Sequence, residues 1–448
     1  MRPLLAFLLL TLGLRAQTIT LTIDPAPVDR AALVVRVPQY PLLALDPRGV
    51  RLCAFDATGK AYPLQLDNPP PQNSPGDDHR EAIAKHYEKM RIEFEAMEAG
   101  RQPQEFVRHL ILMLGFVPAN KTVSLEVRAH DNPGKVSHDG KGQGGKDRDG
   151  ITMSVGGREV LNYRTDKTKK PRPGISEDIL RAGYLHPVRS PSGAIVTGDY
   201  PVNHPHHHGI WTAYTKAVFQ GSNTDFWNMQ NKMGQVDYVG WGATTDGSSD
   251  EAQPVYWRLE FFTAMVDRTG PKPTTALWDS WRLRLYDIPD APKPMVVFDL
   301  TTEQTCATKY PLALPEYHYG SFGLRGPDAW DGKDGARFLT SEGITDRKKG
   351  DGTRARWCYL GGKTEAGLSG TAVLGHPENF RFPMPLRLHP DMPYFSIVPQ
   401  KLGAFSIEPG KPYVTRYRFV VTDGEPDAKL FDACWNSLAY PAVVKVGK

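Results

Sequence analysis

Three stretches in the second half of the chain decide the fold class: VYWRLEFFTAMV at 255–266, SWRLRLYDI at 280–288 and MVVFDLTTEQT at 295–305. Each runs for eight or more residues, and turns rich in Gly, Pro and Asp separate them. Long consecutive strands with scarcely a helical stretch between them are typical of large antiparallel sheets. The sequence therefore predicts a big sandwich or a barrel.

The same pattern extends outward from these stretches to both sides. ITMSVG at 151–156, EAGLSGTAVLG at 365–375 and YVTRYRFVV at 413–421 add further strands, and 424–440 contains the one plausible terminal helix. We assign 151–448 to one large antiparallel β domain.

The preceding residues predict a smaller unit. Short alternating stretches at 18–24, 31–38, 109–116 and 122–129 indicate a small β-sandwich over 17–130. Between these strands, 76–100 carries an apolar stripe at helical spacing and indicates an inserted helix. The Gly-rich, charged segment 131–150 reads as a flexible linker rather than a phosphate loop, since no GK[ST] closes it.

The amino-terminal residues and the overall charge limit the setting. An apolar run at 4–14 behind Arg2 and before Ala16 is typical of a signal peptide, 1–16, and is too short to span a membrane. We therefore expect a secreted or periplasmic protein without a membrane span. A dispersed net charge of +4 argues against nucleic acid. The four cysteines, which form no CxxC pair, could form one or two disulfides or remain buried thiols.

The most unusual stretch is GDYPVNHPHHHGIWTAY at 198–214, which has four histidines in five positions. If the segment is extended, His204, His206 and His208 share one face and His207 points the opposite way, although Pro205 favours a loop. Such imidazoles could bind a divalent transition metal through His204 and His206, or act as general acid and base. The alternative is a set of surface histidines with ordinary hydrogen bonds.

Other groups could complete a site with these histidines. Trp211, Asp225 and Trp227 follow closely, and aromatic rings beside polar groups suit a sugar. A second cluster, LPEYHYGSFGLRG, offers Glu316, His318, Tyr319 and Arg325, which could equally be packing residues. A third stretch has Arg387, His389 and Asp391, either at the rim of a cleft or in a loop that buttresses the domain.

The order of these motifs resembles a known family. GYLHPVRSPSG, VTGDYP, HPHHHGIW, DFWN, YHYGSFGLR, GHPENFRFP and IEPGKPYVTRYRFVV are similar to a bacterial exported family loosely labelled "methane oxygenase PmoA", a domain of unknown function. Its His-x-His-His-x-Gly motif falls on His204, His206, His207 and Gly209. The resemblance implies a role in handling plant or algal polysaccharide. The long strands also resemble the super-sandwich of aldose mutarotases and polysaccharide lyases.

These observations predict a secreted carbohydrate-active enzyme, a lyase or a glycoside hydrolase, with a His-rich cleft in the second domain. His204, His206, His207, Glu316 and His318 are the candidate catalytic residues, and we expect them to meet in one cleft. The candidate substrate-binding residues are Trp211, Asp225, Trp227, Tyr319 and Arg325. The alternatives are a non-catalytic glycan-binding protein and a metal-dependent oxidase.

Overall fold

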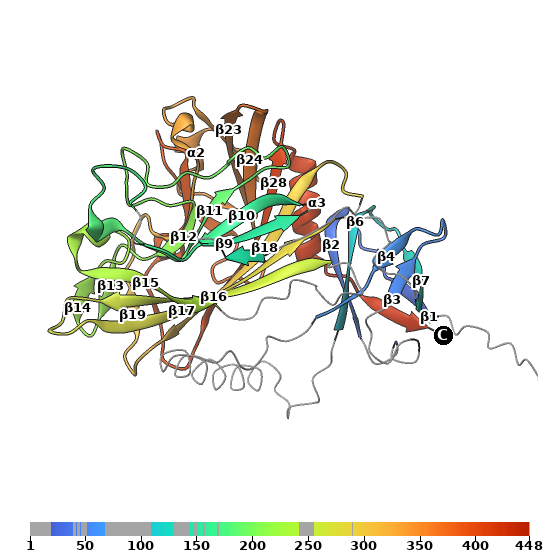
Figure 1. Cartoon of the computed structure of the whole chain (residues 1–448), viewed down its shortest axis with the longest axis horizontal. Coiled ribbons are helices and arrows are strands. Elements are labelled where there is room, and N and C mark those ends of the chain that lie inside the picture. The colour runs from blue at the N-terminus through green and yellow to red at the C-terminus, as the bar shows by residue number, and fades with distance from the viewer. Residues whose placement is uncertain are drawn as a thin grey trace, which may run out of the picture.

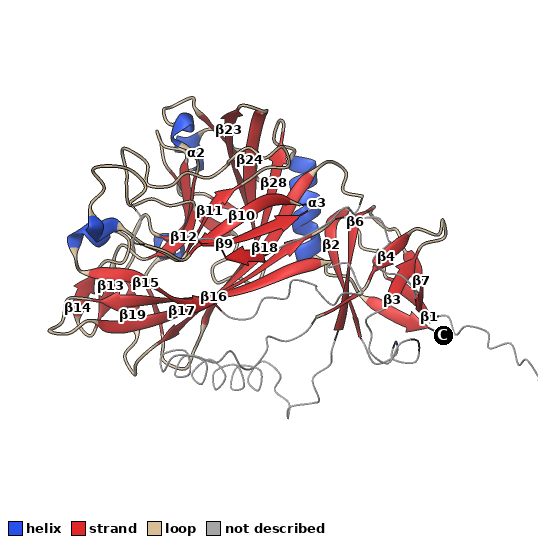
Figure 2. Cartoon of the chain, viewed as in Figure 1, coloured by secondary structure: helices blue, strands red, loops and turns tan. Residues whose placement is uncertain are grey.

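The computed structural model describes residues 19–38, 42, 45, 52–67, 109–129, 144–146, 150–155, 157–167, 170–241, 255–288 and 290–447. The expected signal peptide at 1–16, the expected helix at 76–100 and most of the expected linker at 131–150 lie outside these residues. The described chain is mainly β, as predicted, and strands dominate the view in Figure 2.

The three stretches that decide the fold form the longest strands of an eight-stranded antiparallel sheet. In order across the sheet its strands are β15 (Gly234–Trp241), β16 (Tyr256–Asp267), β17 (Thr274–Tyr286), β18 (Met295–Cys306), β28 (Tyr413–Asp423), β24 (Gly367–Gly375), β23 (Trp357–Thr364) and β21 (Ala336–Thr340).

A nine-stranded antiparallel sheet packs against it. Its order is β22 (Arg354–Ala355), β25 (Met384–Leu388), β26 (Tyr394–Ile397), β20 (Ser321–Arg325), β12 (Ile210–Ala213), β11 (Tyr184–Val188), β10 (Arg158–Arg164), β9 (Gly150–Val155) and β8 (Gly144–Lys146).

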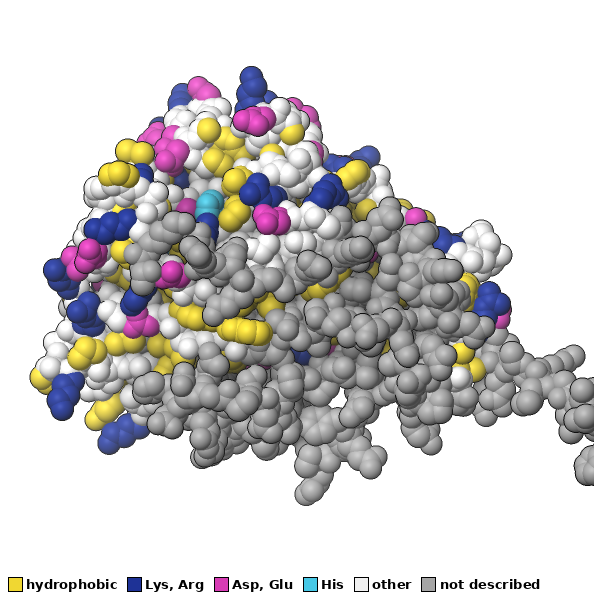
Figure 3. Space-filling view, in the orientation of Figure 1, with side chains coloured by type: hydrophobic (Ala, Val, Ile, Leu, Met, Phe, Trp, Pro, Cys, Tyr) yellow, Lys and Arg dark blue, Asp and Glu magenta, His cyan; other side chains and the backbone are white. Residues whose placement is uncertain are grey.

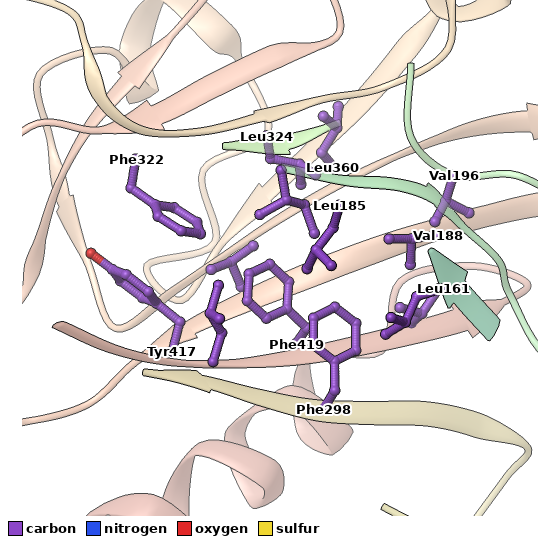
Figure 4. Close-up of a cluster of buried hydrophobic side chains, with 14 of the residues drawn as sticks. Leu161, Leu185, Val188, Val196, Phe298, Phe322, Leu324, Leu360, Tyr417 and Phe419 are labelled. Carbon is purple, nitrogen blue, oxygen red and sulfur yellow. The ribbon is translucent and has the colours of Figure 1, made fainter. Parts of the chain in front are cut away.

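The main hydrophobic core lies between these two sheets. Leu185, Phe322 and Leu324 from the nine-stranded sheet meet Phe298 and Phe419 from the eight-stranded sheet, as Figure 4 shows. Phe298 and Phe419 stack with ring centroids 4.5 Å apart. Because each strand alternates its side chains, one face of each sheet is committed to this core and the other is available for different contacts.

The outer face of the eight-stranded sheet is covered by α3 (Ala428–Ala439) and by β2 (Arg30–Pro38) and β6 (His109–Val117). Phe431 and Cys434 of α3 pack against Trp357 and Tyr359, and Asp427 caps the helix by accepting a hydrogen bond from the Leu430 N–H. The terminal helix predicted at 424–440 is thus confirmed. Figure 1 shows α3 between β28 and β2.

The amino-terminal strands form two small sheets that enclose their own core. One has the order β29 (Val444–Gly447), β1 (Ile19–Ile23), β7 (Val123–Ala129), β3 (Leu52–Phe55) and β4 (Ala61–Pro63); the other consists of β2, β6 and β5 (Gln65–Leu66). The carboxyl-terminal strand β29 therefore returns to pair with β1.

A fifth antiparallel sheet, of four strands, lies at the end of the long strands farthest from the amino-terminal sheets (Figure 1). Its order is β14 (Ser222–Thr224), β13 (Ala217–Phe219), β19 (Leu312–Leu314) and β27 (Phe405–Ile407). Short helices occur at α2 (Arg347–Gly350), η3 (Glu177–Ile179), η4 (Met229–Asn231), η5 (Asp328–Trp330) and η6 (Pro399–Leu402). This four-stranded sheet shares a second apolar cluster with Trp211 and Tyr394.

All four cysteines are buried free thiols, which resolves the choice between disulfides and thiols in favour of thiols. Within the described ranges no helix has the length and apolar character needed to cross a membrane.

Candidate functional site

The outer face of the nine-stranded sheet carries the candidate site. Strand pairing places side chains of β12, β20, β26 and β25 in two rows on this face. The first row is Trp211, Gly323, Ser396 and Arg387, and the second is Arg325, Tyr394 and His389. The alternate residues, such as Ile210, Leu324 and Phe395, point into the main core.

The histidines approach this face from a turn rather than a strand. We call residues 204–207 the histidine turn, because the His207 N–H donates to the His204 carbonyl over 2.8 Å. The segment is therefore not extended, so the condition under which His204, His206 and His208 would share one face is not met, and the loop that Pro205 favours is present. Pro205 lies within the turn, where its missing N–H costs no ladder hydrogen bond.

The segment that carries the turn is attached at both ends to the Arg325 backbone. The Gly198 N–H donates to the Arg325 carbonyl, and the Arg325 N–H donates to the Gly209 carbonyl, each over 2.8 Å. A Cβ at Gly209 would lie 2.1 Å from the Leu185 carbonyl oxygen, so the close approach requires glycine. These anchors explain why glycine follows the histidines.

A group of buried rings, which we call the aromatic floor, lies beneath the turn. It consists of His207, Trp211, Trp227 and Tyr394, whose ring centroids are 4.6 to 6.1 Å apart. Trp211 and Trp227 are 0% and 2% exposed. Because they are buried, these two rings lie at the bottom of the site and cannot serve as an open stacking surface for a sugar.

Three partly exposed imidazoles, which we call the imidazole rim, stand above the floor. The ring centroid of His204 is 5.6 Å from that of His206 and 6.0 Å from that of His389. Burial, together with the neighbouring histidines, lowers the pKa of His206 to about 4. Burial, together with the nearby Arg387 charge, lowers the pKa of His389 to about 4. The rim is therefore uncharged at neutral pH and can donate and accept hydrogen bonds.

Arg325 places a positive charge under the histidine turn. Its side chain is 0% exposed, and Nη2 binds Asp328 at 3.1 Å and Asp331 at 2.7 Å. The same carboxylates accept hydrogen bonds from the exposed end of the loop, at the Val202 N–H and the Asn203 amide. Arg325 therefore holds both the backbone and the tip of the histidine loop.

Among the residues that the structure describes, several buried polar atoms around the floor have no hydrogen-bond partner. They include Nδ1 of His204 and His207, Nε1 of Trp211 and Trp227, and Nε and Nη1 of Arg325. Buried polar groups are nearly always paired, so these atoms are available to hydrogen-bond a ligand or water.

His208 points away from the rim into a separate buried pair. Its Nδ1 lies 3.0 Å from Oδ1 of Asp199, and the Tyr184 hydroxyl donates to Oδ2 over 2.9 Å. Burial lowers the pKa of His208, so we treat it as a neutral imidazole that donates to the carboxylate. Its contacts orient the loop from below.

Two residues of the second predicted cluster reach the histidines and the floor: Arg325, which is hydrogen-bonded to Gly209 and lies opposite Tyr394, and Tyr319. The Tyr319 ring lies 6.1 Å from Trp227, and His318 packs on Tyr319 at 4.9 Å. Glu316 is exposed, and no hydrogen bond or ion pair found in the described ranges links it to the histidine turn. Tyr319 and Arg325 therefore connect the two clusters.

Asp225 has a structural explanation. One carboxylate oxygen accepts the N–H groups of Trp227 and Asn228, and the other accepts the Asn228 amide. Three hydrogen bonds at 2.8 to 2.9 Å fix the turn that presents Trp227 to the floor.

Tyr394 and Ser396 were missed by the sequence interpretation, and Arg387 and His389 were left undecided. Their signal is the alternation Arg387, His389 and then Tyr394, Ser396, on either side of the turn 390–393. Alternation places each pair on one face, but only strand pairing brings that face to the histidines.

A metal at His204 and His206 lacks support from the geometry. Among the described residues, no three His, Cys, Asp or Glu side chains are arranged to hold a metal ion.

A separate hollow of about 440 Å³, lined by Lys167, Glu177, Asp178 and others, does not include the histidine turn. Figure 3 shows a histidine at the surface beside charged side chains on one face of the molecule.

Comparison with known families places this site in a defined domain. Residues 150–436 match the family of unknown function DUF6807. The chain belongs to this family. The DUF6807 range contains the eight-stranded sheet and every described strand that contributes to the two rows of the site. No curated protein matches the sequence.

Gly323 provides a test of the packing in the DUF6807 site. A Cβ at this position would lie 2.9 Å from Cη2 of Trp211 and 3.0 Å from Cζ3. We expect Gly323→Ala to reduce the free energy of unfolding by about 1–3 kcal/mol, because a rigid buried indole would have to move. The measurement is urea unfolding. Gly270→Ala is the control, because its nearest neighbour would be 3.7 Å away, and equal effects would contradict the packing.

Acid should destabilise this part of the fold. Burial lowers the pKa of His186 to about 4, below the 6.5 of an exposed histidine. The unfolded chain therefore binds the extra proton first, and stability present above pH 6.5 is lost as the pH falls towards 4. We expect a loss of roughly 1–2 kcal/mol from this residue between pH 7 and pH 5. Urea unfolding at both values should show a smaller loss in His186→Gln, and an unchanged loss would contradict the assignment.

Proposed function

We propose that the protein is an exported carbohydrate-active enzyme that works by proton transfer at the imidazole rim, as a lyase does. The observation that carries the proposal is the rim itself. The ring centroids of His206 and His389 lie within 6.0 Å of that of His204, and the floor beside them holds buried polar atoms with no partner among the described residues. Export is supported by the leader-like sequence at 1–16, and carbohydrate by the resemblance to polysaccharide-handling proteins and to lyase super-sandwiches.

The rim suits the removal of a proton from carbon. A neutral imidazole, such as that of His206, takes the proton next to a carbonyl or carboxylate group of the sugar. The electron pair left behind forms an enolate, which can accept a hydrogen bond from another neutral rim imidazole, and then a carbon–carbon double bond as the glycosidic C–O bond breaks. The departing oxygen takes a proton from the imidazolium formed in the first step or from water.

The carboxylates near the rim favour this chemistry over hydrolysis. A glycoside hydrolase needs two carboxyl groups free to act on opposite sides of a glycosidic bond. Asp225 is occupied by three hydrogen bonds within its turn, and Asp328 and Asp331 both bind Arg325. Proton transfer by imidazole therefore explains the residues better.

A non-catalytic glycan-binding protein is the second candidate. It is favoured by the lowered pKa of His206 and His389, since such imidazoles are weak bases but good neutral hydrogen-bonding groups. The two candidates differ in whether product forms.

Product analysis separates these possibilities. The purified protein is incubated with plant and algal polysaccharides and their oligosaccharides, and the products are weighed by mass spectrometry. Elimination gives fragments whose masses sum to that of the substrate, whereas hydrolysis adds one water per bond. We expect the former. Binding of a sugar without formation of any product would contradict the enzyme and favour the non-catalytic glycan-binding protein.

A further inference from the structure

Arg387 is a second cation on the site face, and it has more freedom than Arg325. It occupies the first row, at the edge of the group of strands that carries the site. Its Nη1 lies 2.9 Å from Asp351, whose other oxygen binds Lys401 at 2.9 Å. One carboxylate therefore serves two cations, which leaves this trio with one positive charge in excess.

The excess charge faces the rim. His389 follows Arg387 by two residues, and the Arg387 charge contributes, after burial, to the lowered pKa of both His389 and His318. The Arg387 side chain is 20% exposed. Arg325, in contrast, is fully buried and bound to two aspartates.

We infer that Arg387 binds the carboxylate of an acidic sugar, so that the substrates of this site are uronic-acid oligosaccharides. A guanidinium matches a carboxylate in shape and charge. A carboxylate held at Arg387 would bring the adjacent C–H group to the rim beside His389. The inference rests on the proposed function, because that C–H group supplies the proton that a rim imidazole removes.

Calorimetric titration tests the inference with matched sugars. The probes are oligosaccharides of galacturonic, mannuronic and guluronic acid, each with its carboxyl-reduced neutral form. We expect at least one acidic oligosaccharide to bind about tenfold or more tightly than its neutral form. Arg387→Gln should remove that preference. Arg337→Gln, at an exposed ion pair with Glu425 on the other sheet, should retain it.

The outcomes separate this inference from the proposed function. Equal binding of acidic and neutral forms, or an acid preference that survives in Arg387→Gln, would overturn the carboxylate site alone. Turnover of neutral sugars only would also overturn it and leave the proton-transfer enzyme in place. The absence of binding and turnover with every sugar, acidic or neutral, would contradict both.

Discussion

His206→Ala is expected to lower the rate of product formation by about 100-fold or more, because general acid–base groups typically contribute factors of 10² to 10⁴. His206 is partly exposed at the rim, so its removal opens little space in the core. The melting temperature should therefore stay close to that of the unchanged protein. Initial rates with a substrate found in the product screen, together with thermal unfolding, measure both effects.

The control for this variant is His109→Ala, at the start of β6 in the amino-terminal sheets. It should leave the rate unchanged. His207→Ala is a less clean probe than the sequence suggested, because this ring is 3% exposed and packs on Trp211 and Tyr394. We expect it to lose stability as well as turnover. A His206→Ala protein with full activity would remove His206 from the mechanism.

Arg325→Met is expected to cost about 2–3 kcal/mol of the free energy of unfolding. Breaking a buried ion pair costs roughly 3–5 kcal/mol, and the smaller value allows for the partial exposure of Asp328 and Asp331. The substitution would leave two neighbouring carboxylates without their cation and loosen the tip of the histidine loop. Urea unfolding gives the energy, and sugar binding should weaken in parallel.

Arg337→Met is the matched control for this loss. Arg337 and Glu425 form an ion pair at 2.8 Å in which both side chains are exposed, so its removal should cost at most about 1 kcal/mol. If the two variants lose the same small amount, Arg325 does not organise the loop as described.

Much of the fold could be predicted from the sequence, because long strands have a strong local signal. The stretches at 255–266, 280–288 and 295–305 correspond to β16, β17 and β18. Which strands pair with one another in a sheet could not be predicted, since this pairing depends on contacts between residues far apart in the sequence. The pairing of β29 with β1 is one example.

The candidate site was less predictable for the same reason. Local composition indicated the histidines, and Pro205 indicated a loop. However, the floor depends on Tyr394, and Trp211 can lie flat only because its cross-strand neighbour is Gly323. Neither relation has a local signal. The burial of Trp211, which prevents its ring from stacking on a sugar, is likewise a property of the assembled sheets.

The central claim is that sugar binds at the imidazole rim. The most direct test follows the nuclear magnetic resonance signals of the histidine Cε1–Hε1 groups while an oligosaccharide that binds the protein is added stepwise. Signals are assigned by single substitution of His204, His206 and His389. We predict that these three signals shift on binding, whereas those of His109 in β6 and His376 after β24 do not. Saturable binding of the sugar with all three rim signals unchanged would contradict the account.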